Sequence, residues 1–521
     1  MRCSLKFVVD YRADLLPSTH ARFIPLYMHM FRRLDVLRAS HFPRGWLSLA
    51  LALTSTLSAA ATPLTPCRLK GIETEVLCGT VERPENPRDP AARTLAIHFA
   101  VVPALAKNKA PDPLFVFAGG PGQAATRVAG ALQATLAKIN ARRDLVYIDQ
   151  RGTGQSNPLQ CRRDSDRAAT LPSLREAVDP GASLEQLRSC IPTLAADTRF
   201  YTTSIAVGDF DAVRTSLGAP AINLWGGSYG TRAALEYLRQ FPQHVRSVVL
   251  DGVAPATLAL PASFAIDGNA ALNRLLADCE RDRVCHARYP ELSAKIDRLF
   301  AASARRPRVI ATQPLTGTPE TLTLDATTVA SLLRAPLYAP QTAAMLPYAL
   351  AQATQGDSTA LLTLTSAFAS SLAENFSEVM HFAVVCAEDL PRVDPAAIDA
   401  ARRTRFGTAY IDLYRRACAN FAPAAVPPEF YIAPSANVPV LMLSGGRDPA
   451  TPPEHAAALA QSLPNARHLL APNLGHGVSS QGCAPELITR FIRQANFDAI
   501  DGSCLEKIPA PPFFHAPDGQ P

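Results

Sequence analysis

The sequence has no large excess of charge of either sign, which limits the partners it can bind. Its 521 residues carry 51 Lys and Arg against 45 Asp and Glu. Residues 1–61 hold eight of the basic and three of the acidic side chains, which leaves 43 basic against 42 acidic in the remainder. No nucleic-acid partner is expected, because binding to phosphates needs clustered positive charge.

The chain also lacks the cysteine and histidine spacings of a structural metal site. It has no CxxC pair and no cluster of Cys and His ligands, so no metal is expected. Ten of the 11 cysteines lie beyond residue 61 and fall into successive near neighbours, as in the disulfide frameworks of exported proteins. We expect them to pair in chain order, which gives five disulfides from Cys67, Cys78, Cys161, Cys190, Cys279, Cys285, Cys386, Cys418, Cys483 and Cys504.

The apolar run WLSLALALTSTL at residues 46–57 is too short to cross a bilayer comfortably. Four arginines precede it, and SAAAT follows it with the small residues of a cleavage site. We expect residues 1–61 to be a signal peptide and the mature protein to be periplasmic or secreted, without stable membrane insertion. The alternative is that this segment stays on the protein as an amphipathic anchor.

Near-continuous apolar runs alternate with helical patterns from residue 94 onward. Such runs are typical of strands that are covered on both faces. The alternation predicts an α/β protein with a mostly parallel, doubly wound sheet. The predicted strands lie in residues 94–104, 113–120, 144–152, 222–228, 246–253, 438–446 and 466–472.

One long segment interrupts this alternation. Residues 261–435 are rich in Ala, Leu and Arg at helical spacing, which predicts a helical lid domain inserted into the sheet domain. The core would then consist of residues 62–260 and 436–500, followed by a Pro-rich, extended tail at residues 501–521.

The stretch GGSYG at residues 226–230 lies between a predicted strand and a predicted helix. A GxSxG pattern in this context indicates a sharp strand-to-helix turn that exposes the serine hydroxyl as a nucleophile. Gly226 and Gly230 must be small, because the two backbones nearly touch there. Ser228 is therefore the predicted nucleophile, and a plain tight turn is the alternative.

A serine nucleophile needs a histidine base and an acid that orients it. In this architecture they follow the serine in the order acid, histidine, at the ends of later strands. Asp448 follows the strand in residues 438–446, and His476 follows the last one, between two glycines. Asp251, at the end of an earlier strand, is the alternative acid.

The oxyanion of the reaction needs two backbone N–H donors. We expect one from Tyr229 and the other from the glycine-rich loop at Gly119 and Gly120. The same loop fits the GxGxxA pattern of a dinucleotide site, but Pro121 stands where that pattern needs free amides. No cofactor is therefore expected.

Several motifs together resemble secreted α/β-hydrolase serine peptidases of the proline iminopeptidase and tripeptidyl aminopeptidase group. They span almost all of residues 67–504 and are CGTVERPENP (78–87), GGPG (119–122), DQRGTGQS (149–156), GGSYG (226–230), LDGV (250–253), VVCAEDLP (384–391), GRDPATP (446–452) and LGHG (474–477). The resemblance implies an α/β-hydrolase fold with a helical lid and a triad of Ser228, Asp448 and His476. It also implies exopeptidase action on free N-termini.

Two positions depart from this group. Ala118 stands where many relatives have His, and Tyr229 where proline-specific relatives often have Trp, so a substrate that begins with proline is not implied. An aminopeptidase must bind a charged α-amine, for which Glu388 and Asp389 in the lid are the candidates. The alternative is that these carboxylates brace the lid, where His381 would brace the same region.

We therefore expect an exported serine hydrolase, above all an aminopeptidase that acts on small peptides through an acyl-enzyme. A carboxylesterase or lipase with the same Ser-Asp-His triad is the first alternative. A non-catalytic binding protein that keeps the fold is the second.

Overall fold

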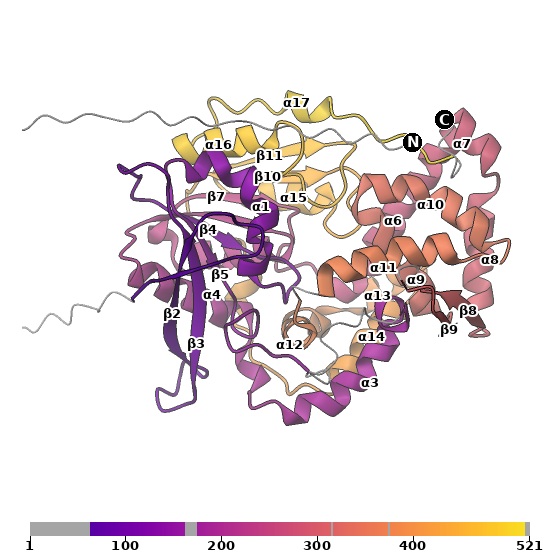
Figure 1. Cartoon of the computed structure of the whole chain (residues 1–521), viewed down its shortest axis with the longest axis horizontal. Helices are drawn as coiled ribbons and strands as arrows, with labels where there is room; N and C mark the ends of the chain where they lie inside the picture. Colours follow the sequence, from indigo (N-terminus) through magenta and orange to yellow (C-terminus); the bar gives the residue numbers. More distant parts are fainter. Residues whose placement is uncertain (1–62, 162–173, 314–315, 374–375, 516–521) are drawn as a thin grey trace, which may run out of the picture. The chain divides into compact units, whose positions relative to one another are not determined.

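The computed structural model of the protein describes residues 63–161, 174–313, 316–373 and 376–515 (Figure 1). The predicted signal peptide at residues 1–61 and the last six residues of the tail lie outside this part of the chain. None of the described helices is both long and apolar enough to cross a bilayer.

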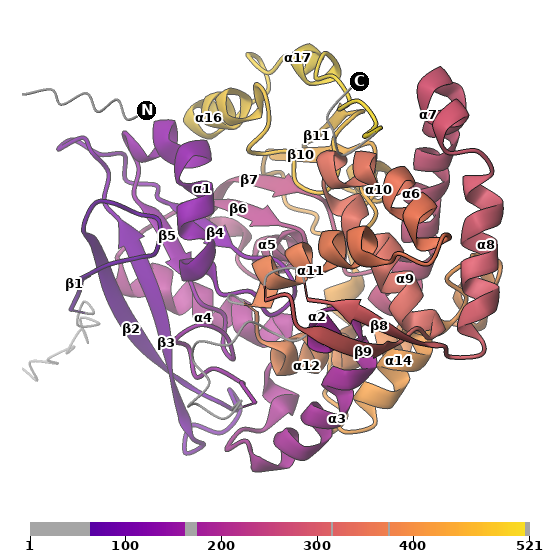
Figure 2. The same cartoon turned by 45° about the vertical axis from the view of Figure 1, so that its right-hand side comes forward.

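In the described residues, nine strands form one mixed sheet in the order β1-β2-β3-β5-β4-β6-β7-β10-β11 (Figure 2). The strands are β1 (Thr65–Cys67), β2 (Val76–Pro84), β3 (Thr94–Val102), β4 (Leu114–Phe117), β5 (Leu145–Ile148), β6 (Ile222–Gly227), β7 (Val245–Asp251), β10 (Val440–Gly445) and β11 (Ala466–Ala471). The pairings β1–β2, β2–β3 and β3–β5 are antiparallel, and the other five are parallel. The predicted mostly parallel α/β sheet is confirmed.

Helices cover both faces of this sheet, which explains the continuous apolar runs of its strands. On one face pack α1 (Ala125–Asn140) and α16 (Ala484–Gln494), and on the other α4 (Thr203–Ser216), α5 (Tyr229–Gln240) and α15 (Pro453–Ala460). Alternate residues of each strand enter the two cores. Those facing α1 and α16 include Val116, Tyr147, Trp225, Val249 and Leu441; those facing the other way include Phe117, Ile148, Leu224, Leu250 and Met442.

A helical region is inserted between β7 and β10, as the sequence predicted. We call helical cap the helices α2 (Leu174–Val178), α3 (Pro180–Cys190), α6 (Leu260–Arg281), α7 (Arg283–Arg288), α8 (Leu292–Ser303), α9 (Ala326–Arg334), α10 (Pro340–Ala353), α11 (Thr359–Ala373), α12 (Glu378–Glu388), α13 (Pro395–Arg402) and α14 (Ala409–Cys418). It has a core of its own, which includes Leu272, Leu333, Leu346, Leu362 and Ile411. The antiparallel pair β8 (Arg308–Thr312) and β9 (Pro319–Thr323) lies in it and is not among the strands predicted from the sequence.

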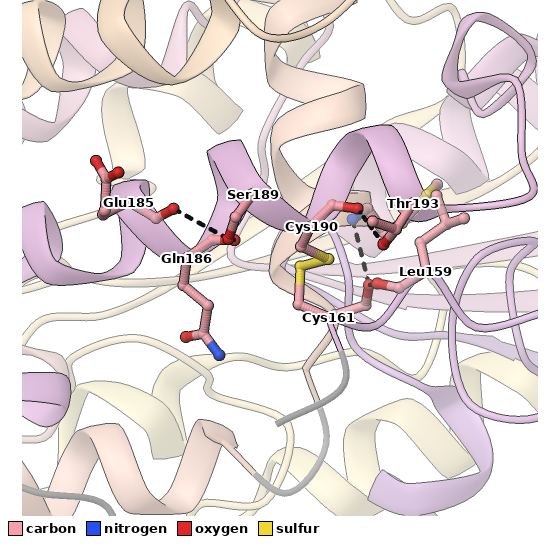
Figure 3. Close-up of a disulfide and its surroundings, with 9 residues drawn as sticks. Leu159, Cys161, Glu185, Gln186, Ser189, Cys190 and Thr193 are labelled. Atoms are coloured by element: carbon pink, nitrogen blue, oxygen red, sulfur yellow. Dashed lines mark hydrogen bonds between the residues drawn. A yellow bond between two sulfur atoms is a disulfide. The ribbon is translucent and has the colours of Figure 1, made fainter. Parts of the chain in front are cut away.

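The helical cap contains a segment that lies outside the expected range of residues 261–435. Helices α2 and α3 come from the stretch between β5 and α4, yet Leu174 and Val178 are buried in the core of the cap. A disulfide between Cys161 and Cys190 ties the end of α3 to the loop after β5 (Figure 3). Two separate insertions thus build the cap.

The described residues contain five disulfides, and they follow the chain order. They join Cys67–Cys78, Cys161–Cys190, Cys279–Cys285, Cys386–Cys418 and Cys483–Cys504. Beyond α17 (Ser503–Glu506) the tail is extended and reaches the cap, where Tyr289 donates a hydrogen bond to the carbonyl of Phe514 at 2.9 Å. Such a number of disulfides is typical of proteins that fold outside the cytoplasm.

Candidate active site

Ser228 lies at the sharp turn between β6 and α5, with φ of 57° and ψ of −125°. A non-glycine residue at positive φ is strained, and such strain is common at functional sites. A Cβ on Gly226 would meet the carbonyl oxygen of Gly230, and one on Gly230 would meet that of Phe117. The glycines on either side of the serine are therefore required by the close approach of β4, β6 and α5.

The predicted oxyanion loop lies directly beside Ser228. A Cβ on Gly119 would be 3.1 Å from the Cβ of Ser228, and Gly120 has a φ of 110° that only glycine adopts easily. Tyr229 is the first residue of α5, so its amide points out of the positive end of that helix. The predicted donors thus flank the serine.

Helix α12 holds this loop from the cap side. Ser377, just before the helix, donates its amide to the carbonyl of Gly122 at 2.8 Å, and the His381 Nδ1 lies 3.0 Å from the carbonyl of Pro121. Burial lowers the pKa of His381 to about 4, so the ring is neutral. Its Nδ1 then donates to Pro121 and its Nε2 accepts from the Tyr414 hydroxyl at 2.6 Å. His381 therefore braces the loop.

Asp448 and His476 meet beyond the ends of β10 and β11. The His476 Nδ1 lies 2.8 Å from Asp448 Oδ2, and the hydroxyl of Thr451 donates to the same oxygen at 2.8 Å. The other carboxylate oxygen accepts the amides of Ala450 and Thr451. Since Nδ1 donates to Asp448, Nε2 is the nitrogen that is left to accept a proton.

The two groups shift each other's pKa. Burial alone would raise the pKa of Asp448, but His476 and the donors from Thr451 and Ala450 outweigh it and hold the pKa below its ordinary value. Burial likewise lowers the pKa of His476, yet the charges of Asp448 and Asp251 outweigh it and raise that pKa above its ordinary value. The pair is built to hold a positive charge on the imidazole.

The loop that carries His476 is fixed by the helical cap. The backbone amide of His476 donates to the carbonyl of Tyr338 at 2.8 Å. The Tyr338 ring packs edge-on against the imidazole of His476, with 5.2 Å between the ring centroids. Tyr338 closes the 3₁₀-helix η5 (Ala335–Tyr338), which follows α9. A Cβ on Gly475 would meet the same carbonyl, so this position also needs glycine.

Ser228 and His476 line one cavity of about 610 Å³. No hydrogen bond joins their side chains in the described part of the chain; such bonds often tighten only when substrate binds. The walls include two ionisable side chains from the cap, Glu378 of α12 and Arg334 of α9, which are not among the site residues expected from the sequence. A cavity of this size suits a small ligand.

Comparison with known proteins identifies the fold that carries this site. Residues 112–285 match the model of the alpha/beta hydrolase fold, and residues 404–504 match that of TAP-like proteins. The chain has the α/β-hydrolase fold.

Relatives of this α/β hydrolase include both proteases and esterases. It is 27% identical to serine protease Hip1 of Mycobacterium tuberculosis over 465 aligned residues. The alignment covers 82% of this chain and 88% of Hip1. Carboxylesterase B of the same species is 29% identical over 424 residues, covering 74% and 78%. The tripeptidyl aminopeptidase of Streptomyces lividans is 29% identical over 145 residues, covering 26% and 27%. This α/β hydrolase is accordingly a serine hydrolase, and its resemblance to the aminopeptidase group is confirmed.

Asp251, the alternative acid, has another position in the hydrolase. Its carboxylate accepts the amides of Val478 and Ser479, each at 2.8 Å, and its carbonyl accepts the amide of Ser228 at 2.8 Å. It therefore fixes the chain on both sides of the site, while Asp448 contacts the imidazole. This geometry favours Asp448 as the partner of His476.

Glu388 and Asp389, the residues expected to bind the substrate amine, do not line the cavity. Asp389 accepts from both Nη atoms of Arg232, at 3.0 and 2.9 Å, and Glu388 accepts the amide and hydroxyl of Thr203 at 2.6 and 2.9 Å. Both side chains are fully buried, and burial raises the pKa of Glu388 to about 7 despite the nearby Arg232. These contacts match the alternative in which the two carboxylates brace the lid.

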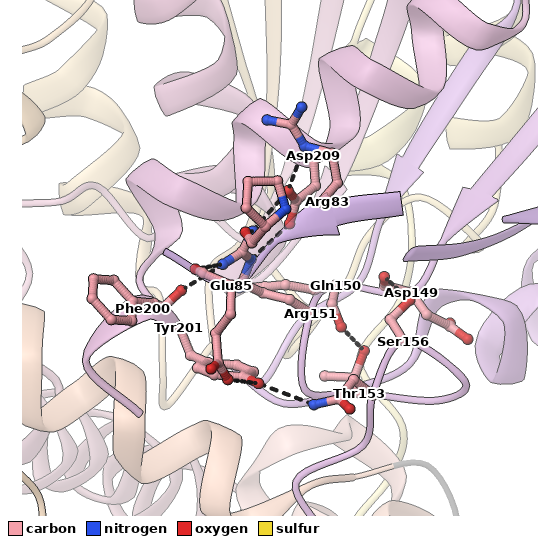
Figure 4. A network of polar contacts seen from close by, with 12 residues as sticks. Arg83, Glu85, Asp149, Gln150, Arg151, Thr153, Ser156, Phe200, Tyr201 and Asp209 are labelled. Atoms are coloured by element: carbon pink, nitrogen blue, oxygen red, sulfur yellow. Dashed lines mark hydrogen bonds and ion pairs between the residues drawn. The ribbon is translucent and has the colours of Figure 1, made fainter. Parts of the chain in front are cut away.

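A buried polar network beneath the site explains the DQRGTGQS motif (Figure 4). Arg151 is paired with Asp209 through Nε and Nη2, at 2.7 and 2.8 Å. The neighbouring Gln150 donates to the Tyr229 hydroxyl at 3.1 Å, and that hydroxyl also contacts Thr203 at 2.5 Å. The motif therefore fixes the ring of the residue that follows the nucleophile.

Proposed function

We propose that this protein is an exported aminopeptidase that cleaves small peptides from their free N-termini through an acyl-enzyme. One observation carries the proposal: Ser228, His476 and an acidic side chain of the cap, Glu378, line a single cavity, and His476 is paired with the buried Asp448 behind it. A serine hydrolase that has to bind a cationic end of its substrate needs such a carboxylate next to its nucleophile.

The proposed mechanism uses the groups of the site in order. His476 Nε2 takes the proton of Ser228 as its hydroxyl attacks the scissile carbonyl. The amides of Tyr229 and of the loop at Gly119 and Gly120 hold the oxyanion. The imidazolium, stabilised by Asp448, then protonates the leaving amine, and a water molecule releases the acyl group by the same steps.

Glu378 takes the place of Glu388 and Asp389 as the group proposed to bind the α-amine. It is the first residue of α12 and is partly buried, and Ser377 beside it bonds to Gly122 of the oxyanion loop. An ammonium at Glu378 would therefore lie on the acyl side of the scissile bond. A partly buried carboxylate binds a cation more strongly than an exposed one, because less water screens the pair.

The esterase alternative has one specific observation in its favour, which is the similarity to carboxylesterase B over 74% of this chain. Three matched substrate series separate the two functions: peptidyl anilides with a free N-terminus, the same anilides with an acetylated N-terminus, and short-chain esters. We expect turnover of the first series to exceed that of the second at least ~10-fold, the effect of one charge-assisted contact. Equal turnover of both series, or turnover of esters alone, would contradict the proposal.

A variant pair tests the amine site itself. In Glu378→Gln we expect KM for free N-termini to rise about 10-fold, with little change for acetylated substrates, because only the former carry the charge. Glu280→Gln is the matched control, since Glu280 is an exposed glutamate of the cap on α6. The site is elsewhere if both variants behave alike.

The proposal of export rests on the predicted signal peptide and on the five disulfides. Fractionation of the cells that make the protein, with N-terminal sequencing of the mature chain, tests it. We expect an N-terminus near residue 62 and the protein outside the cytoplasm, whereas an intact N-terminus on a cytoplasmic protein would overturn this part.

A further inference from the structure

Arg334 is a buried cation on the wall of the active-site cavity. The residue is only 9% exposed, and no carboxylate of the described residues lies within ion-pair distance of it. One Nη donates to the Tyr338 hydroxyl at 2.8 Å, while the buried Nε has no hydrogen-bond partner. Burying an unpaired charge is costly, so a cation in this position indicates a use.

Aromatic rings hold the guanidinium in place without neutralising it. Its central carbon lies 4.2 Å from the ring centre of Phe264, 5.1 Å from that of Tyr338 and 5.9 Å from that of Tyr410. Cation–π contacts offset part of the cost of burial and fix the plane of the group. Because the rings carry no net charge, the positive charge remains available to an anion in the cavity.

Arg232, the other arginine on the cavity wall, is a buried cation whose charge is balanced by carboxylates. It is 1% exposed and forms a bidentate ion pair with Asp389, and Glu388 lies 3.5 Å from its Nη1. The carboxylates of the protein itself thus satisfy Arg232. No described group does the same for Arg334.

The position of Arg334 relative to the base indicates which part of a substrate reaches it. Arg334 is the last residue of α9, and η5 follows it directly. The last residue of η5 is Tyr338, whose carbonyl accepts the amide of His476 and whose ring packs against the imidazole. In the proposed mechanism His476 gives its proton to the leaving amine. Arg334 therefore lies on the side of the leaving group, whereas Glu378 lies beside the oxyanion loop.

We propose that Arg334 binds a carboxylate on the leaving portion of the substrate, so that the preferred substrates are short peptides with an anionic group just beyond the scissile bond. This inference rests on the proposed function. The planar guanidinium is suited to a carboxylate, because two of its N–H groups can donate to the two oxygens in parallel. The carboxylate can be the C-terminus of a short peptide or an Asp or Glu side chain.

Substrate pairs that differ only in this charge test the proposal and separate its two sources. Ala-Ala, Ala-Ala-Ala and Ala-Ala-Ala-Ala are compared with their C-terminal amides, and Ala-Ala-Glu-amide with Ala-Ala-Gln-amide, by mass spectrometry of the products. We expect kcat/KM to be about 10-fold higher for the charged member of at least one pair, a difference typical of a charge-assisted contact. Ratios near one in every pair would overturn the proposal.

Variants assign the preference to Arg334. The ratio of charged to neutral substrate should fall to near one in Arg334→Gln and be partly kept in Arg334→Lys. It should be unchanged in Arg298→Gln, which removes an exposed arginine of the cap on α8. An unchanged ratio in a folded Arg334→Gln protein would overturn the proposal. If that variant does not fold, calorimetry on Ser228→Ala decides, because the peptide acid must then bind more tightly than its amide.

Failure of the proposed function gives a different result. If peptides are not cleaved but esters are, the same comparison is made with the acetate esters of glycolic acid and of glycolamide, in which the leaving alcohol carries a carboxylate or its neutral amide. A preference for the charged ester that Arg334→Gln abolishes would keep the carboxylate site and reject the aminopeptidase. Turnover of peptides without a preference for the charged substrate would keep the aminopeptidase and reject the carboxylate site.

Discussion

Two regions meet at the cavity and use their polar groups differently. At the sheet rim, by which we mean Gly119, Gly120, Ser228, Asp448 and His476 at the ends of the strands, close backbone contacts and hydrogen bonds fix each group. On the helical cap, the side chains of Glu378 and Arg334 line the cavity. Catalytic groups held in fixed positions serve a reaction that is the same for every substrate. Ionisable side chains on the cap can instead bind one substrate more tightly than another. Changes at the rim should therefore lower kcat, and changes on the cap should alter KM.

The largest effect is expected at the nucleophile. Ser228→Ala should lower kcat by about 10⁶-fold, because the remaining groups of a triad contribute little without the nucleophile. KM and the melting temperature should change little, since the substitution removes one oxygen at the cavity surface. Steady-state kinetics with calorimetry of both proteins measures this. Activity within 100-fold of the wild type would require another nucleophile and would contradict the catalytic role of the rim.

The acid of the rim comes next. Asp448→Asn should lower kcat by about 10⁴-fold, the loss typical of an imidazole that is no longer oriented. His476 must be neutral to act as base, and its raised pKa places the loss of wild-type activity, as pH falls, above the ordinary histidine value. Removal of the Asp448 charge lowers that pKa, so the acid limb of kcat/KM should move to lower pH.

Asp251→Asn is the matched variant for this test. It changes a carboxylate that accepts the amides of Val478 and Ser479, so we expect a smaller loss of kcat and a lower melting temperature. If Asp251→Asn lost more activity than Asp448→Asn and displaced the acid limb further, the assignment of the acid would be reversed.

The rim could be predicted from the sequence, because its signals are local. GxSxG between a strand and a helix, and an Asp and a His after later strands, are patterns of neighbouring residues, and the structure brings Asp448 and His476 to 2.8 Å. The cap could not be predicted in the same way. The aromatic rings around the Arg334 guanidinium are those of Phe264, Tyr338 and Tyr410, which lie on α6, η5 and α14.

The pair of Glu388 and Asp389 shows the same limit. In the sequence Glu388 and Asp389 stand out as a pair of acids in the lid, but Arg232, which pairs with Asp389, is 157 residues away in the chain. Glu378, ten residues upstream on the same helix, carried no signal beyond its charge. The part of the cap formed by α2 and α3 was missed because its segment precedes the insertion that the composition revealed.

The contact between rim and cap gives a prediction of intermediate size. In Gly475→Ala the new methyl group would meet the carbonyl of Tyr338, so the loop with His476 must shift. A displacement of a catalytic group by about 1 Å lowers kcat on the order of 10²-fold. Gly208→Ala is the control, because the nearest atom to a Cβ there is 3.9 Å away. If the kcat of Gly475→Ala were within 3-fold of the wild type, the cap would not position the base.

The smallest effects on activity are expected at Glu388 and Asp389, which belong to the cap but do not reach the cavity. Asp389→Asn leaves the buried Arg232 without its partner, and breaking a buried pair costs about 3–5 kcal/mol of stability. Glu388→Gln should act in the opposite direction. Burial raises its pKa to about 7, so the folded wild type loses stability as pH rises from the ordinary value of about 4 to that range, and a neutral Gln avoids this loss.

Unfolding measured from pH 4 to pH 8 should therefore separate the two variants. Asp389→Asn should be less stable than the wild type at pH 8, and Glu388→Gln equally stable or more stable there, with no such gain at pH 4. For both variants we expect kcat/KM on free N-termini within about 3-fold of the wild type, because neither carboxylate touches the cavity. A 10-fold rise of KM for free but not acetylated N-termini in either variant would return the amine-binding role to this pair and take it from Glu378.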